Sequence, residues 1–84
     1  TGVADLPRSR GRVTVGGVRL PGWHRDGYAL WDGISWCWTE IARGAKPPPT
    51  WDPVVLQGHW RRDRWGMGWL IFERWQPLAL PAGA

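Results

Sequence analysis

The chain has 84 residues, a formal net charge of +4 and nine tryptophans. A domain of this size buries only about 60% of its unfolded surface, and the single cysteine, Cys37, excludes an intrachain disulfide. We therefore expect aromatic packing and association with partners to stabilise it. The longest apolar run, residues 69–72, is far shorter than the roughly 20 residues of a membrane span, so we expect a soluble, intracellular protein.

Three segments follow one another along the chain. Residues 1–11 lack apolar periodicity and are predicted to form an extended basic N-terminal arm. Residues 12–75 contain alternating apolar and polar side chains, which indicate a small β domain. Residues 76–84 hold two prolines and small side chains, and are predicted to form an extended C-terminal tail.

The first predicted hairpin turns at Gly16-Gly17, which separates two alternating runs. Two consecutive glycines tolerate the positive φ angles of a two-residue turn. Its apolar face would carry Val13, Val15, Val18 and Leu20.

The second predicted hairpin turns at Asp32-Gly33, one of the strongest short hairpin signals. Pairing Trp31 with Ile34 places three indoles on one face, because cross-strand partners point the same way. We expect this face to lie in the core, with Trp31, Trp36 and Trp38. The opposite, mixed face would be half-exposed and would carry Tyr28, Leu30, Ser35, Cys37 and Thr39. Residues 39–43 can then form one helical turn, and the prolines at 47–49 force an extended connector.

The third predicted hairpin joins residues 54–62 to residues 69–75. Its first strand has a shared face with Val54, Leu56 and Trp60. Its return strand is apolar on both faces, with Trp69, Ile71 and Trp75 on one and Leu70 and Phe72 on the other. Such a strand lies inside a closed structure or under a partner.

Three hairpins predict an all-β fold, a small five- or six-stranded barrel or sandwich with extended N- and C-terminal arms. The sequence contains no catalytic motif, because Ser35 lacks a nucleophile elbow. His24, Cys37 and His59 also lack the ligand spacing of a zinc site. We therefore expect no enzyme, no metal and no cofactor.

Trp23, Trp51 and Trp65 lie in turn contexts, where side chains tend to be exposed. Because Trp and Arg are enriched at binding hot spots, we expect these three tryptophans either to anchor a partner or to cap the open ends of the barrel. The full predicted partner-binding set is Trp23, Trp51, Trp65, Arg8, Arg10, Leu78 and Leu80. The leading hypothesis is a non-enzymatic structural subunit of a larger assembly, most specifically a minor or decoration protein of a phage-like virion (capsid or tail). It would be made in the host cytoplasm and present in many copies, and deletion of residues 1–11 would weaken incorporation without unfolding the domain.

A nucleic-acid-binding small β-barrel is the alternative, because residues 59–65 interleave cations with indoles. Single-stranded nucleic acid binds to such surfaces by stacking and by phosphate neutralisation. The residues of this alternative are Trp60, Arg61, Arg62, Arg64 and Trp65. A carbohydrate-binding module is the third hypothesis, which the lack of asparagine disfavours.

Overall fold

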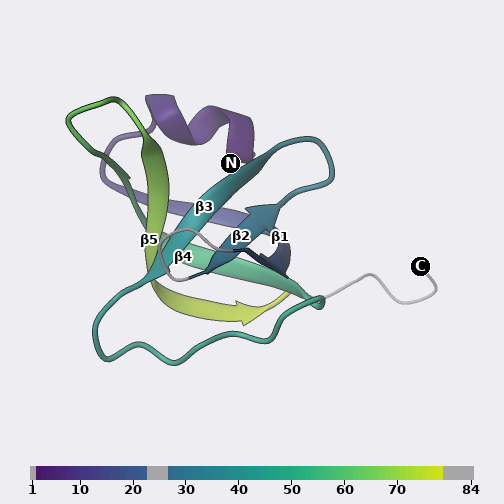
Figure 1. Cartoon of the computed structure of the whole chain (residues 1–84). Helices are drawn as coiled ribbons and strands as arrows, with labels where there is room; N and C mark the ends of the chain where they lie inside the picture. The colour runs from purple at the N-terminus through teal and green to yellow at the C-terminus, as the bar shows by residue number, and fades with distance from the viewer. Residues whose placement is uncertain (1, 23–26, 79–84) are drawn as a thin grey trace.

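The computed structural model describes residues 2–22 and 27–78, and these residues form a closed five-stranded barrel with a short 3-10 helix before it (Figure 1). The elements in chain order are η1 (Val3–Arg8), β1 (Arg12–Pro21), β2 (Tyr28–Trp31), β3 (Trp36–Ile41), β4 (Pro53–Arg62) and β5 (Gly68–Pro77). Around the barrel the strands follow the order β1-β2-β3-β5-β4, and β1 closes it by pairing with β4. The β3–β5 pair is parallel and the other four pairs are antiparallel. The predicted all-β barrel is confirmed.

β1 is one continuous strand, so the hairpin predicted at Gly16-Gly17 is wrong. Its first half pairs with β4 and its second half with β2, and Val18 takes part in both pairings. Gly17 serves close packing rather than a turn. A Cβ on Gly17 would lie only 2.5 Å from the carbonyl oxygen of Trp31, which is the kind of backbone approach that glycine in a strand permits.

The continuity of β1 also changes which of its residues share a face. Side chains alternate along a strand, so Val13, Val15 and Arg19 point into the barrel, and all three are buried. Val18 and Leu20 have the opposite parity and lie on the outer face, where they are only partly covered. The four-residue apolar face predicted for a hairpin therefore does not exist.

β2 and β3 form the second predicted hairpin with a longer loop. Trp31 pairs with Trp36 rather than with Ile34, so four residues instead of two connect the strands. A shift of two residues keeps every side chain on its predicted face. The shared face of the three indoles is therefore correct, but it lies on the outside of the barrel.

The inner face of this hairpin carries the residues that we expected to be half-exposed. Leu30, Cys37 and Thr39 are all buried, whereas Trp31 and Trp36 are exposed. The predicted core position of the indoles is wrong for this reason. β3 continues to Ile41, so the residues of the predicted helical turn are largely in a strand.

β4 and β5 form the third predicted hairpin, with a β-bulge in its return strand. Gln57 pairs with Arg74, but the next residue, Gly58, pairs with Phe72. Glu73 is therefore the extra residue, and a bulge of this kind reverses the alternation of side chains beyond it.

The bulge places Trp75 on the inner face, so the prediction that it shares a face with Trp69 and Ile71 is wrong. Before it, Leu70 and Phe72 point inward and are fully buried, while Trp69 and Ile71 point outward. After it, Trp75 packs against the core. The two-faced apolar pattern thus arises within one closed barrel.

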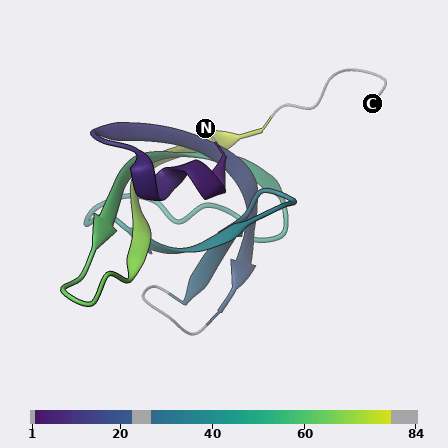
Figure 2. The same cartoon turned by 90° about the horizontal axis from the view of Figure 1, so that it is seen from above.

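η1 lies across one mouth of the barrel (Figure 2). Its Val3 and Leu6 belong to the core, and Leu6 is fully buried. The prediction of an extended arm over residues 1–11 is therefore wrong at residues 3–8. At the other end of the chain β5 continues to Pro77, two residues beyond the predicted domain boundary, and residues 79–84 lie outside the described part.

A buried arginine links the barrel to the proline connector. The Arg19 guanidinium lies over the Tyr28 ring, 3.9 Å from its centroid, and 5.5 Å from the centroid of Phe72. It also donates a hydrogen bond of 3.1 Å to the carbonyl oxygen of Pro48. A charge this deep in a small domain requires such partners, and the connector supplies one of them.

Among the described residues, no helix is long and apolar enough to cross a membrane.

The bulge predicts a strong penalty for a side chain at Gly58. A Cβ there would lie 1.9 Å from the Ile71 carbonyl oxygen and 2.6 Å from the Phe72 Cα. We expect Gly58→Ala to lower the free energy of unfolding by about 1–3 kcal/mol or more, because backbone must move. Urea denaturation measures this. Gly16→Ala is the matched control, since its Cβ would meet nothing closer than 3.8 Å, and an equal loss in both variants would contradict the packing argument.

The packing of η1 predicts that the N-terminal residues stabilise the domain. Leu6→Ala should lower the free energy of unfolding by about 2–5 kcal/mol, because it opens a cavity in the core. Leu78→Ala is the control, since Leu78 is 40% exposed. Thermal unfolding followed by circular dichroism compares the two. Deletion of residues 1–11 should likewise destabilise the barrel, and a deletion variant as stable as the full chain would refute this role.

Candidate ligand-binding face

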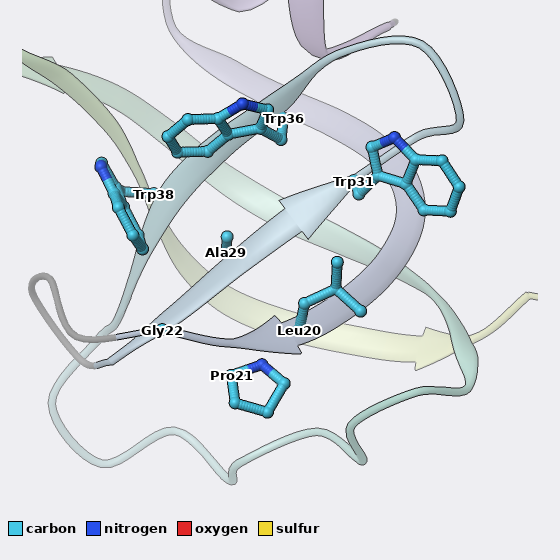
Figure 3. Close-up of a pocket in the computed structure, with 7 residues that line it drawn as sticks. All are labelled: Leu20, Pro21, Gly22, Ala29, Trp31, Trp36 and Trp38. Atoms are coloured by element: carbon cyan, nitrogen blue, oxygen red, sulfur yellow. The ribbon is translucent and has the colours of Figure 1, made fainter.

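The outer surface of β1, β2 and β3 contains an apolar groove with a volume of about 530 Å³. Figure 3 shows Trp36 and Trp38 on one side of it, Trp31 near one end, and Ala29 between them. The groove is lined by Leu20, Pro21, Gly22, Ala29, Trp31, Trp36 and Trp38. It is the natural place to look for a ligand, because pockets for ligands are concave and mostly apolar.

The strand register builds a continuous row across this face. Leu20 pairs with Ala29, Ala29 with Trp38, and Trp38 with Trp69. Cross-strand partners point the same way, so the small side chain of Ala29 forms a low floor between larger neighbours. The row continues onto β4, where Arg61 pairs with Trp69. An apolar surface therefore ends at a cation.

The indoles are held in a fixed arrangement. The rings of Trp36 and Trp38 meet edge to face, with centroids 5.0 Å apart and planes at 82°, a geometry that favours aromatic pairs. Trp38 in turn lies against the backbone, since a Cβ on Gly22 would be 2.5 Å from its ring. Trp36 is 58% exposed and Trp31 is 42% exposed. Both indoles thus remain accessible, and the ring of Trp36 is held by its contact with Trp38.

Comparison with family models, with curated proteins and with solved structures finds no match for this chain. Its function is therefore argued from the groove and from the charges around it.

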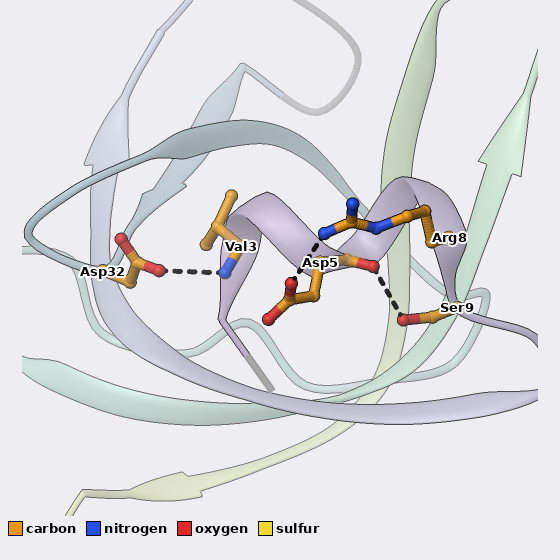
Figure 4. A network of polar contacts seen from close by, with 5 residues as sticks. All are labelled: Val3, Asp5, Arg8, Ser9 and Asp32. Carbon is orange, nitrogen blue, oxygen red and sulfur yellow. Dashed lines mark hydrogen bonds and ion pairs between the residues drawn. The ribbon is translucent and has the colours of Figure 1, made fainter.

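The loop that joins Trp31 to Trp36 is fixed by Asp32. The carboxylate accepts hydrogen bonds from the backbone N–H groups of Ser35 and Ile34, at 2.8 and 2.9 Å. Its second oxygen accepts one from Val3 of η1 at 2.9 Å (Figure 4). These backbone donors, Ser35 first, lower the pKa of Asp32. One side chain thereby connects the groove to the helix that closes the barrel.

The residues predicted as partner anchors do not gather in one place. Trp51 is 67% exposed and Trp65 is 81% exposed, but neither lines the groove. Arg8, Arg10 and Leu78 are also exposed. Trp23 and Leu80 lie outside the described residues. The exposure of Trp51 and Trp65 agrees with their turn contexts, and their role as anchors remains a prediction.

The predicted nucleic-acid residues divide between two environments. Trp60 is half-buried and packs against the core. Arg61 and Arg62 are exposed at the end of β4, and the Arg64 guanidinium lies 5.3 Å from the centroid of the Trp65 ring. The interleaved sequence therefore produces one stacked cation–indole pair on the β4–β5 loop, with further arginines beside it.

The titratable groups around the barrel do not form a reactive cluster. Burial raises the pKa of the Cys37 thiol to about 12, so it is protonated at neutral pH. Cys37 points inward, whereas His59 lies exposed on β4 and His24 lies outside the described residues. Within residues 2–22 and 27–78, no group of His, Cys, Asp and Glu side chains is arranged to hold a metal.

Sequence reasoning placed the three indoles on one face and missed that this face lies on the outside of the barrel. The signal that could have decided between the faces is side-chain size. Leu30, Cys37 and Thr39 are compact enough for a narrow interior, whereas three indoles are not.

The contacts of Asp32 predict acid-sensitive stability. Its pKa is lowered in the folded state, so its stabilising contribution is present above the ordinary carboxyl pKa of 3.8 and is lost as the pH falls below it. We expect Asp32→Asn to lower Tm at neutral pH and to flatten the fall of Tm between about pH 5 and pH 2. Asp52→Asn is the control, because Asp52 is exposed. A wild-type pH profile in Asp32→Asn would contradict the assignment.

Proposed function

We propose that the barrel binds single-stranded nucleic acid on its outer β2–β3 face. Bases stack on Trp31 and Trp36, and arginines at the β4–β5 end neutralise phosphates. The observation that carries the proposal is the outer face on which the exposed pair Trp31 and Trp36 lies next to the row that runs from Trp38 through Trp69 to Arg61. Stacking on aromatic side chains combined with cationic neutralisation is the general way in which proteins bind single strands.

The topology supports the same face. The order β1-β2-β3-β5-β4, with β1 closing on β4 and β3 parallel to β5, is the strand order of the OB fold. Barrels of that fold bind oligonucleotides and oligosaccharides on the face of strands 2 and 3 and with the loops between strands 1 and 2 and between strands 4 and 5. Here the indoles lie on those two strands, and the arginine-rich loop is the one between β4 and β5. Fold alone does not establish function, so the side chains carry the argument.

The charges at the loop are available to a ligand. Asp63, the nearest carboxylate in sequence, accepts hydrogen bonds from the backbone N–H groups of Trp65 and Met67, both at 2.9 Å. Arg61 and Arg64 form no ion pair with the carboxylates of residues 2–22 and 27–78. Guanidinium groups in this state can bind phosphate oxygens in a bidentate manner.

A structural subunit of a virion or other assembly is a second candidate, favoured by the exposure of Trp51 outside the groove. Large exposed aromatic side chains are typical anchors of protein interfaces. The packing of η1 on its own barrel removes the support that an extended N-terminal arm would have given to this candidate. The two candidates therefore differ in which indole matters.

Substitution of the groove indoles tests the proposal. We expect Trp36→Ala to weaken binding of a fluorescent oligothymidylate about 5- to 100-fold, because each stacked base contributes about 1–3 kcal/mol. Trp51→Ala is the matched control and should bind like the full wild-type chain. Fluorescence anisotropy at fixed salt measures both. Affinity of the wild type should also fall steeply with salt.

The other candidates give distinct results in the same experiments. Absence of oligonucleotide binding by the wild type refutes the proposal. Loss of self-association or of partner assembly in Trp51→Ala, with no effect of Trp36→Ala, favours the assembly subunit. Quenching of indole fluorescence by neutral oligosaccharides, independent of salt, favours a carbohydrate module.

A further inference from the structure

A second pocket lies where η1 meets the end of β4. Its volume is about 520 Å³, and its lining is polar, unlike that of the groove. Three of the six lining residues are arginines: Arg8, Arg10 and Arg62. Trp60 forms an aromatic wall beside them. The pocket is separate from the groove, with which it shares no residue.

The guanidinium groups of this arginine pocket are gathered by local contacts. Arg62 donates a hydrogen bond to the carbonyl oxygen of Pro7, which fixes it against the helix. Arg8 pairs with Asp5 at 3.0 Å. Arg10 forms no ion pair with the carboxylates of residues 2–22 and 27–78 and is exposed. Three cations and one carboxylate leave an excess of two positive charges in one concave site.

Such an arrangement favours the binding of an anion. Like charges that share a site repel each other, and water screens them only in part inside a concavity. Phosphate oxygens match the planar donor fork of arginine, which binds them by paired hydrogen bonds. Ser9, the neutral residue between two of the arginines, already donates its hydroxyl to the carbonyl oxygen of Asp5 at 3.0 Å, so the arginines provide the recognition.

We infer that the arginine pocket is a phosphate site, which takes a phosphate group of the nucleic-acid strand bound in the apolar groove. The inference rests on the proposed function for the source of the phosphate. Successive residues of a strand point to opposite faces, so Arg61 lies on the side of the indole row and Arg62 on the side of the pocket. A nucleic-acid strand that crosses Trp69 and Arg61 therefore reaches Arg62 by passing over the end of β4.

The salt dependence of binding tests this path. For single strands the slope of log K against log salt is about −0.7 per phosphate contact. The double variant Arg10→Ala/Arg62→Ala, which removes the one phosphate contact of the pocket, should therefore make this slope shallower by about 0.7 for an oligothymidylate long enough to cover both sites. The control is Arg43→Ala/Arg74→Ala, which removes the same charge from exposed positions that line neither site. An unchanged slope in the pocket variant, or an equal change in the control, overturns the path.

Inorganic phosphate and pyrophosphate test the pocket without nucleic acid. At constant ionic strength, we expect either anion to shift the amide resonances of residues 8–10 and 62 in the wild type and in Trp36→Ala, and to leave those of the Arg10→Ala/Arg62→Ala variant unchanged. Near-wild-type circular dichroism of the variant establishes that it is folded, and Arg10→Ala alone spares the contact between Arg62 and Pro7.

The two experiments separate the two proposals. Phosphate binding without oligonucleotide binding upholds the pocket as a site for a free phosphate compound and refutes the nucleic-acid function. Oligonucleotide binding with an unchanged slope, and without phosphate-induced shifts, upholds the function and refutes the pocket.

Discussion

The narrow interior of a five-stranded barrel is the constraint on which the rest of this structure depends. An eight-stranded barrel is just wide enough for its side chains to fill it, and five strands enclose less space. The largest fully buried side chain is Phe72, and the others are aliphatic or Thr39. The indoles of Trp31, Trp36 and Trp38 therefore lie on the outer face of their strands. The ligand-binding face proposed here is a direct consequence of how little the barrel can contain.

Closure of so small a barrel also requires backbone to approach backbone. Gly17 and Gly58 occupy such places, since a Cβ on either would overlap a carbonyl oxygen of a neighbouring strand. The bulge at Glu73 follows from the same crowding, because it lies opposite Gly58. It sends Phe72 inward and leaves Trp69 outward, beside Trp38. Core packing and the indole row are thus set by one local irregularity.

Sequence patterns predicted two hairpins of the barrel. They did not predict the features that depend on how the barrel closes. Alternation predicted the β4–β5 hairpin, and Asp32-Gly33 predicted the turn between β2 and β3 together with the shared face of its indoles. Gly16-Gly17 misled because glycine serves a turn and a close approach equally well, and only the partner strand distinguishes them. The 3-10 helix that holds Leu6 is too short to show a helical repeat of apolar residues. The burial of Leu6 also depends on the mouth of the barrel, which exists only once the barrel has closed. The groove was not predicted because alternation along a strand shows which side chains share a face, but not whether that face points into the barrel or out of it.

An exposed pair of indoles is costly in a small domain, and its rigidity gives it a use. Trp36 is locked edge to face against Trp38, and Trp31 is tied to η1 through the Asp32 loop. A platform that is fixed before a ligand arrives loses little side-chain entropy on binding. Flat bases can stack on indoles that are held in this way, because each base presents a π-face to an aromatic ring. The arginines beside the platform then decide between neutral and anionic ligands, because they favour a chain that carries a charge at every step.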